Sequence, residues 1–307
     1  MIFLVTGGAG FLGSALANRL AADGHEVRVI DDLSAGDPAR LSEKALFTRG
    51  DVNDRPKLWT LLQGVDCVYH LAARVSVAES VLYPREYNAA NVGGAVSVME
   101  AMRDVGVRRV VLTSSGAVYG ENAIQPLHEE LTPEPASPYA VGKLAAEYYV
   151  RTIGKLWGIE TVALRVFNAY GPNQPNPAAH APVIPHFLKR ALGGGSVVAV
   201  GNGGETRDYV YVTDVVNGLV AAAFATGVDR QVINIGSGVE TSVNDLIKRI
   251  GTAIGKSVDV VYNPAERGGV SRMRADLTKA QTLLGYQPRV SLADGLKQML
   301  EDDLRFR

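Results

Sequence analysis

Thr6-Gly7-Gly8-Ala9-Gly10-Phe11-Leu12-Gly13, near the start of the 307-residue chain, is the stretch that decides the fold. The apolar residues 2–5 before it predict a buried strand, and the pattern near 12–23 after it predicts a helix. Its glycines fit both G-x-G-x-x-G and G-x-x-G-x-x-G, so the backbone can turn sharply and approach a pyrophosphate. The free N–H groups and the positive dipole end of the helix favour the phosphates. We therefore predict a dinucleotide site around Gly7, Gly10, Phe11, Leu12 and Gly13.

The first half of the chain alternates short apolar runs with longer helical patterns. Strands are predicted at 2–5, 26–30, 46–48, 67–71, 110–113 and 161–166, with helices near 12–23, 54–62, 84–104 and 138–155. This order builds βαβ units, so we expect an α/β fold with a doubly wound parallel sheet of the Rossmann type.

The pattern changes after Tyr170, where a long loop at 171–182, rich in Pro, Asn and Ala, is predicted. Helices near 183–193, 213–226, 242–254 and 292–303, with short strands between them, predict a smaller mixed α/β domain. We assign residues 1–172 to a dinucleotide-binding domain and 173–307 mainly to a substrate-binding domain. Segments at about 205–238 are free to pack back onto the first domain.

Acidic residues follow the second and third predicted strands. Asp31 and Asp32 come about 20 residues after the glycines, where a carboxylate accepts hydrogen bonds from a ribose and repels a 2′-phosphate. NAD is therefore the expected cofactor rather than NADP. The alternative is a glycine turn with a solvated acidic pair. Asp51 and Val52 end the third strand and could meet the adenine, although Asp51 alone also suits the N-cap of the next helix.

Ser137-Pro138-Tyr139-Ala140-Val141-Gly142-Lys143 is the most informative stretch for chemistry. Ser137 suits an N-cap and Pro138 the first helical position, so Tyr139 and Lys143 share one helical face. A tyrosine is a poor base because its ordinary pKa is ~10. We expect the neighbouring ammonium to lower this pKa and make the phenol a proton acceptor. The alternative is an ordinary surface helix.

Ser114 and Ser115 follow the predicted strand at 110–113, at the carboxyl edge of the sheet. Ser115 could donate a hydrogen bond to the same substrate oxygen as Tyr139. The alternative is a turn residue that ends the strand.

Together these stretches resemble the extended short-chain dehydrogenase/reductases, and within them the NAD-dependent UDP-glucose 4-epimerases. The similarity covers 6–13, 31–34, 70–73, 91, 114–120, 139–143, 165–172, 201–214 and 283–288. It implies that Tyr139 is the catalytic acid/base, Lys143 its partner and Ser115 the residue that orients the hydroxyl. It also implies NAD contacts from further residues: Ser34, Leu71, Ala72, Ala73, Asn91 and Ser114.

Gly116 and Ala117 stand just before Val118-Tyr119-Gly120. Sugar-nucleotide 4,6-dehydratases typically have Asp-Glu there, and UDP-glucuronate decarboxylases a Glu, because these reactions move an additional proton. Without that acid the resemblance implies epimerisation at C4 of a UDP-hexose (UDP-glucose/UDP-galactose) through a transient 4-keto sugar. The alternatives are a UDP-glucuronate or UDP-N-acetylhexosamine 4-epimerase, a 4-keto-sugar reductase, and a non-catalytic NAD(H)-binding regulator.

The UDP-sugar is expected to contact Ser115, Tyr139 and Asn168. The assignment of Asn168 is implied by the resemblance, and the alternative is that its amide only caps the loop. The forked guanidinium of Arg207 suits a diphosphate, and a salt bridge to Asp208 or Asp214 is the alternative.

A second arginine is harder to assign, because the Arg-x-Gly-Asp of the epimerase branch reads Glu266-Arg267-Gly268-Gly269 here. Arg267 and Arg272 both remain candidates for the phosphates, with a solvated loop as the alternative.

The overall composition limits the partners. A formal net charge of −1 gives no general attraction to nucleic acid or an anionic membrane, and no apolar stretch is long enough to span one. The single cysteine, Cys67, fits a reducing cytoplasm. His180 and His186 alone do not predict a metal. The resemblance implies a homodimer through helices near 84–104 and 136–154.

Overall fold

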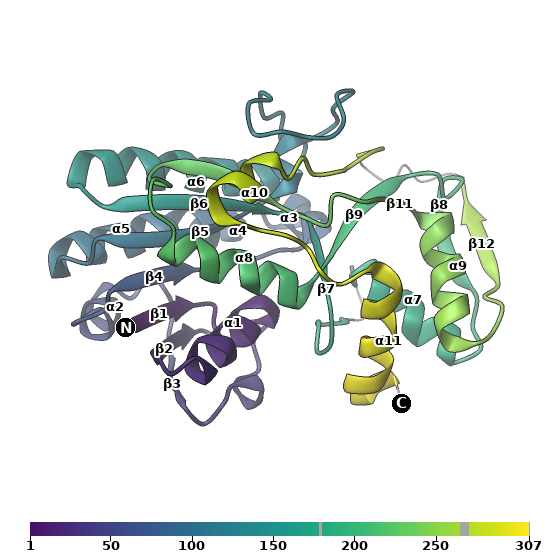
Figure 1. Ribbon diagram of the computed structural model, residues 1–307, viewed down its shortest axis with the longest axis horizontal. Coiled ribbons are helices and arrows are strands. Elements are labelled where there is room, and N and C mark those ends of the chain that lie inside the picture. The colour runs from purple at the N-terminus through teal and green to yellow at the C-terminus, as the bar shows by residue number, and fades with distance from the viewer. Residues whose placement is uncertain (178–179, 265–269, 307) are drawn as a thin grey trace.

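Seven parallel strands form the large sheet of the computed structural model, which describes residues 1–177, 180–264 and 270–306 (Figure 1). Their order is β10-β6-β5-β4-β1-β2-β3. The strands are β1 (Ile2–Thr6), β2 (Glu26–Asp31), β3 (Ala45–Arg49), β4 (Cys67–His70), β5 (Arg109–Ser115), β6 (Glu160–Val166) and β10 (Gln231–Ile235). The order reverses between β1 and β4, and ligands bind at such a switch point. The predicted doubly wound parallel sheet is confirmed.

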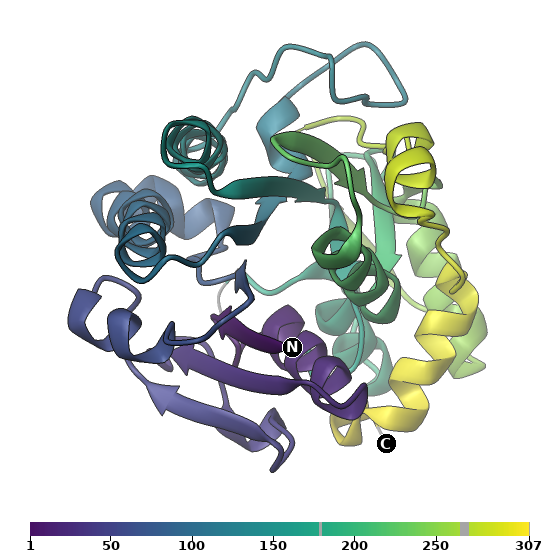
Figure 2. The ribbon, with the colours of Figure 1, turned by 60° about the vertical axis from the view of Figure 1, so that its left-hand side comes forward.

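Helices cover both faces of this sheet (Figure 2). On one face lie α1 (Phe11–Ala22) and α8 (Val212–Phe224), and on the other α2 (Arg55–Leu61), α5 (Gly94–Val105) and α6 (Pro138–Trp157). Strand β1 serves both layers, because Phe3 and Val5 belong to the core on the first face and Leu4 to the core on the second. Burial on both faces explains why the strands read as continuous apolar runs.

A smaller mixed part stands beside the large sheet. Its strands are β7 (Asn168–Tyr170), β8 (Val197–Val200), β9 (Thr206–Tyr211), β11 (Glu240–Ser242) and β12 (Val260–Asn263). Its helices are α7 (Val183–Leu192), α9 (Val243–Ile254) and α11 (Leu292–Asp302). Strand β9 pairs parallel with β7 and antiparallel with β11, and β12 pairs parallel with β8.

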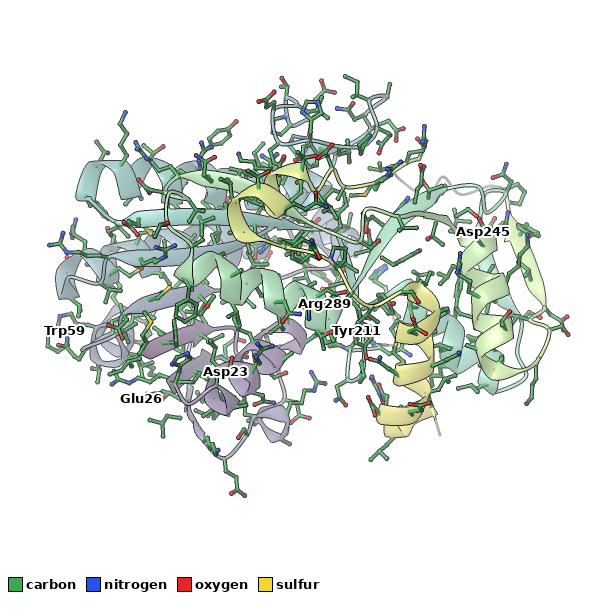
Figure 3. The ribbon with its side chains drawn as sticks, in the orientation of Figure 1. Asp23, Glu26, Trp59, Tyr211, Asp245 and Arg289 are labelled. Carbon is green, nitrogen blue, oxygen red and sulfur yellow. The ribbon has the colours of Figure 1, made fainter. Side chains whose placement is uncertain are left out.

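The two parts share a packed junction. Tyr170 and Tyr211 meet edge to face, with ring centroids 5.3 Å apart, and Figure 3 shows Tyr211 where β9 leads into α8. Helix α8 and strand β10 lie in the second half of the sequence yet join the large sheet, because β10 pairs with β6 and α8 packs on α1. The chain therefore crosses between the two parts more than once.

The helix predicted near 84–104 is interrupted. Helix α3 (Val77–Leu82) precedes α4 (Pro84–Asn88), a π-helical turn at Ala89–Gly93 and then α5. Pro84 has no N–H to continue α3 but suits the first turn of α4. Helix α10 (Thr278–Leu284), which packs near β10 and α8, was not predicted.

Candidate active site

A cavity of about 1160 Å³ lies at the carboxyl edge of the large sheet and is bounded on its far side by the smaller part. The predicted residues on its wall are Gly7, Gly10, Phe11, Leu12, Gly13, Asp31, Asp32, Ser34, Asp51, Val52, Leu71, Ala72, Ala73, Ser114, Ser115, Tyr139, Lys143, Asn168 and Arg207. The sheet order brings these scattered segments together, because the carboxyl ends of parallel strands meet at one edge.

The glycine loop leaves the space that a pyrophosphate needs. Gly7 has a φ of +67°, and a Cβ built on it would lie 2.6 Å from the Ala72 nitrogen. A Cβ on Gly13 would collide with the Gly7 carbonyl oxygen. Gly10 caps α1 without any side chain, so the first N–H groups of the helix are not covered by a capping side chain. The loop therefore fits the phosphates of a dinucleotide.

Two aspartates stand at the end of β2, where the cofactor's adenosine is expected. Asp31 accepts hydrogen bonds from the Ala9 and Leu33 nitrogens at 3.0 and 2.9 Å. Burial raises the pKa of Asp31, and these backbone hydrogen bonds oppose the rise. The exposed Asp32 accepts from the Ser34 nitrogen at 2.8 Å. Either carboxylate still has lone pairs for ribose hydroxyls.

Asp51 is not the N-cap of the following helix. Asp54 holds that position and accepts a hydrogen bond from the Lys57 nitrogen at 3.2 Å. Asp51 instead accepts from the Asn53 nitrogen at 2.8 Å and faces the cavity. The N-cap alternative for Asp51 is therefore wrong, and its contact with the adenine stays a prediction.

The catalytic helix begins as the sequence predicts. Ser137 caps α6 by accepting from the Ala140 nitrogen at 3.2 Å, and Pro138 follows as its first residue. Tyr139 and Lys143 are both buried, and the Lys143 ammonium donates to the Thr113 carbonyl oxygen at 2.9 Å. Ser115 ends β5 and accepts from the Ala117 nitrogen at 3.2 Å. Ser115 is thus a turn residue and also part of the cavity wall.

The expected electrostatic effect on Tyr139 is wrong for this protein. Burial raises the pKa of Tyr139, and the only opposing contribution comes from a hydrogen bond with Ser115. Burial also lowers the pKa of Lys143 to about 8, opposed by the charge of Glu147. Desolvation therefore dominates at both groups, because both lie in the interior.

Asn91 is buried, and it is absent from the described wall of the cavity. Its side-chain oxygen accepts from the Arg74 nitrogen at 2.8 Å, and its amide donates to the Arg74 carbonyl at 3.0 Å. Arg74 itself lines the cavity, although the sequence did not suggest it. Asn91 therefore acts on the site by holding the backbone of Arg74.

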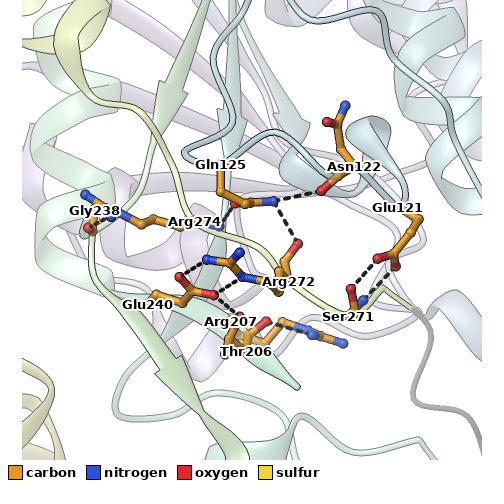
Figure 4. A network of polar contacts seen from close by, with 10 residues as sticks. All are labelled: Glu121, Asn122, Gln125, Thr206, Arg207, Gly238, Glu240, Ser271, Arg272 and Arg274. Carbon is orange, nitrogen blue, oxygen red and sulfur yellow. Dashed lines mark hydrogen bonds and ion pairs between the residues drawn. The ribbon is translucent and has the colours of Figure 1, made fainter. Parts of the chain in front are cut away.

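The arginines differ in their surroundings (Figure 4). Arg207 lines the cavity, donates to the Thr206 carbonyl at 2.8 Å and lies 3.8 Å from Glu205. Arg272 forks onto Glu240 at 2.7 and 2.8 Å and is not among the described wall residues. Arg267 lies outside the described residues.

Arg207 does form a salt bridge, as its alternative predicted, but with Glu205 and not with Asp208 or Asp214. Asp208 accepts from the Ser237 and Gly238 nitrogens, at 2.6 and 2.9 Å. Asp214 accepts from the Arg289 nitrogen at 3.0 Å. Asp208 also accepts from the Ser237 hydroxyl at 2.7 Å, and Glu205 lies 3.8 Å from Arg207.

Some wall residues gave no signal in the sequence. Glu121 accepts hydrogen bonds from the nitrogen and hydroxyl of Ser271, and its pKa lies below the usual value because of them. Gln174 donates to the Ala169 carbonyl at 3.0 Å. Both lie in loops without periodicity, so only the folded chain shows that they reach the cavity.

Metal-binding clusters and membrane-spanning helices are absent from the described residues. Among residues 1–177, 180–264 and 270–306, no three His, Cys, Asp or Glu side chains gather in a way that could hold a metal ion. No helix in that part of the chain is long and apolar enough to cross a membrane. Cys67 is buried, and burial raises its pKa to about 12.

The switch-point cavity, the glycine cradle and the buried Tyr–Lys pair define a dinucleotide-binding enzyme of the Rossmann type. The chain belongs to the NAD dependent epimerase/dehydratase family, which matches residues 3–236. It is 41% identical to the UDP-glucose 4-epimerase of Mycolicibacterium smegmatis over 97% of both proteins. These matches confirm the resemblance stated above and NAD as the cofactor.

Solved structures agree with this assignment. The UDP-glucose 4-epimerase of Thermotoga maritima with UDP-glucose has a TM-score of 0.94 at 38% identity, with 98% of both chains covered. The Thermus thermophilus UDP-glucose 4-epimerase in complex with NAD has a TM-score of 0.90 at 32% identity, again over 98% of both chains. A UDP-glucuronate 4-epimerase of Thermodesulfobacterium geofontis is also 31% identical over 96% of this chain and 94% of its own length. This UDP-glucuronate 4-epimerase is thus about as similar to the chain as the Thermus thermophilus UDP-glucose 4-epimerase, and less similar than the enzymes of Mycolicibacterium smegmatis and Thermotoga maritima.

Proposed function

We propose that this enzyme epimerises C4 of a UDP-hexose, interconverting UDP-glucose and UDP-galactose. The observation that carries the proposal is the wall formed by Ser115, Tyr139 and Lys143 beside a glycine cradle, in a cavity that extends to Arg207. The relatives named UDP-glucose 4-epimerase support it. One cavity of about 1160 Å³ supplies room for a dinucleotide and a sugar nucleotide together.

The reaction needs one proton transfer and one reversible oxidation at the same carbon. NAD, when bound, supplies the reversible hydride acceptor. In our proposal Ser115 orients the 4-hydroxyl, and Tyr139 takes its proton and returns it when the 4-keto sugar has turned over. Lys143 anchors the site through the Thr113 carbonyl and adds a positive charge behind the phenol.

Two features of the wall favour a reaction that moves this single proton. A Cβ on Gly116 would lie 3.2 Å from both Phe167 and Met273, so a larger acid does not fit there without movement. Glu121 is an acid on the wall, but Ser271 holds it and its pKa is below the usual value. Glu121 therefore stays charged and is a poor proton donor near neutral pH. Dehydration and decarboxylation, which need a further proton carrier, are disfavoured.

We assign the substrate diphosphate to Arg207 and place Asn168 beside the diphosphate or sugar. Arg207 presents a planar fork on the cavity wall, and such a fork binds diphosphate oxygens in pairs. Arg272 is already bound to Glu240 on both nitrogens that face that carboxylate. This pairing makes Arg272 the weaker candidate.

The test is product analysis without added cofactor. The purified chain is incubated with UDP-glucose, UDP-galactose, UDP-glucuronate, UDP-N-acetylglucosamine and dTDP-glucose. The proposal expects the first two to interconvert fastest. Faster conversion of UDP-glucuronate or the N-acetylhexosamine would assign the enzyme to that sugar. In a separate incubation with a 4-keto sugar and added NADH, stoichiometric consumption of the NADH would indicate a reductase. Binding of NADH without conversion of any sugar would indicate a regulator.

A homodimer remains part of the proposal, with the exposed apolar surface on α6 and on α3, which precedes the helix expected near 84–104. Val81 and Leu82 on α3 and Val141 and Tyr148 on α6 are more than half exposed. Helices α3 and α6 contact each other, and Val141 and Tyr148, seven residues apart, share one helical face. An exposed apolar surface of this kind suits a second copy of the chain. The cytoplasmic location also stays a prediction.

A further inference from the structure

A buried ion pair lies directly behind the catalytic residues. Tyr139, Lys143 and Glu147 are spaced four apart on α6, so they share one helical face. The side chain of Glu147 is 1% exposed and that of its partner Arg165 is 4% exposed. Removing two charges from water is costly, so a pair at this depth calls for a role beyond stability.

The carboxylate of Glu147 connects three elements. Ser114 on β5 donates its hydroxyl to one oxygen at 2.5 Å. Arg165 on β6 donates to both oxygens, at 3.0 and 2.8 Å. Ser114 and Arg165 face each other in the β5–β6 register, one residue before Ser115 and Val166. Glu147 thus fixes α6 against the exact strand ends that carry Ser115.

Arg165 is held from its other side as well. Its guanidinium lies 4.7 Å above the centre of the Tyr119 ring. The Tyr119 hydroxyl donates to the Asn234 side-chain oxygen on β10 at 2.8 Å. Arg165, which binds the Glu147 carboxylate, is therefore itself held in place by Tyr119, and Tyr119 is held by Asn234 on β10.

We propose that Glu147 is a positioning residue that keeps Ser115 and Lys143 aligned with Tyr139 and supplies the negative charge facing the Lys143 ammonium. The inference deepens the proposed epimerase function and rests on it. Glu147 is not itself among the described wall residues, but it accepts a hydrogen bond from Ser114, which is, so in this proposal it acts on the substrate only through its neighbours.

The groups around Lys143 make this charge decisive. Lys143 faces Glu147 and Tyr139 from its own helix, the Thr113 carbonyl from β5 and His70 from β4. Burial lowers the pKa of His70 to about 3, so the imidazole is neutral and offers no compensation. Desolvation lowers the pKa of Lys143 to about 8, and the negative charge of Glu147 is what opposes a further fall. Without Glu147 the ammonium loses its proton closer to neutral pH.

The test replaces the pair and follows Lys143 directly. Glu147→Gln alone leaves Arg165 buried and uncompensated, so it is expected to unfold easily. The informative variant is Glu147→Met with Arg165→Met, because hydrophobic replacement of a whole buried pair is often tolerated. Ser114→Ala removes this hydrogen bond and keeps the charge of Glu147; its NAD content is measured as well, because Ser114 also lies on the cavity wall. Glu160→Gln is the control, since Glu160 pairs with Arg109 across the same two strands at their other end.

Two readouts separate alignment from charge. NMR titration of lysine labelled with ¹³C at Cε should show the Lys143 pKa falling by about one unit in the double methionine variant, because a nearby opposite charge is lost. The kcat of the double methionine variant should fall ~10-fold or more, and the alkaline limb of its kcat–pH profile should move to lower pH by as much as the Lys143 pKa falls. Ser114→Ala should lower kcat ~3- to 10-fold with the limb unmoved. Glu160→Gln should match the wild type in both readouts.

The outcomes distinguish this inference from the proposed function. A folded double variant with an unchanged Lys143 titration and wild-type kcat overturns the role of Glu147. A wild-type protein that converts no UDP-sugar overturns the epimerase proposal, and the lysine titration still judges the role of Glu147 in that case.

Discussion

Replacing Arg207 by alanine tests how the substrate is held. The guanidinium lines the cavity, and its described contacts are the Thr206 carbonyl at 2.8 Å and Glu205 at 3.8 Å. The ion pair with Glu205 is partly exposed, so its loss should change the free energy of unfolding by less than ~1 kcal/mol. Hydrogen bonds from a charged donor to the diphosphate are worth ~1.5–3 kcal/mol together. Their loss predicts a ~10- to 150-fold rise in KM for the UDP-sugar.

The assay follows initial rates of UDP-galactose conversion, together with the NAD content of the purified variant. We expect KM to rise while kcat changes only a few-fold and bound NAD stays at the wild-type level, because the glycine cradle is untouched. Arg272→Ala is the matched control: its guanidinium is bound to Glu240, and its KM should change less than ~3-fold. Loss of NAD from the Arg207 variant, or a larger effect at Arg272, would refute the assignment.

The remaining predictions concern the cofactor, pH and assembly. Gly13→Ala should purify with little or no bound nucleotide, because the added methyl group collides with the Gly7 carbonyl oxygen; the nucleotide is measured by chromatography after denaturation. Gly24→Ala is the control. A Cβ there meets open space, so this variant should keep its NAD, although the φ of +87° at Gly24 makes it less stable. The kcat should fall as pH rises through about 8, because the buried Lys143 is charged only below its lowered pKa, and an alkaline limb near 10 would contradict this. Val81→Glu with Tyr148→Glu should convert a dimer to monomers in light scattering, whereas a mass equal to the wild type would exclude this face as the interface.

Local patterns were enough to predict most of the large sheet. Six of its strands follow from short apolar runs, and the glycine loop and the Ser137–Pro138 cap predict where α1 and α6 begin. These features depend on neighbours in the sequence, so they can be recognised without the fold. The π-helical turn at Ala89–Gly93, inside the helix expected near 84–104, was missed because the apolar periodicity of the sequence gives no sign of it.

Features that depend on tertiary contacts were harder to predict from the sequence. Glu240 lies 32 residues before Arg272, and Ser271 lies 150 residues after Glu121, so neither pairing appears in a local window. The same reason hides the role of Asn91 toward Arg74, a contact across 17 residues and an interrupted helix. The pKa of Tyr139 was predicted with the wrong direction because its spacing from Lys143 is visible in the sequence while the burial of both groups is not.

The most direct test follows the hydrogen on C4. UDP-galactose deuterated at C4 is incubated with the purified enzyme in ordinary water, and the UDP-glucose formed is examined by mass spectrometry and NMR. If Tyr139 moves only the hydroxyl proton while the carbon-bound hydrogen stays within the site, the UDP-glucose formed keeps its deuterium at C4. Tyr139→Phe should then slow the formation of UDP-glucose ~10²-fold or more, whereas Tyr262→Phe should not. Product that has exchanged its C4 deuterium with the solvent would contradict the account.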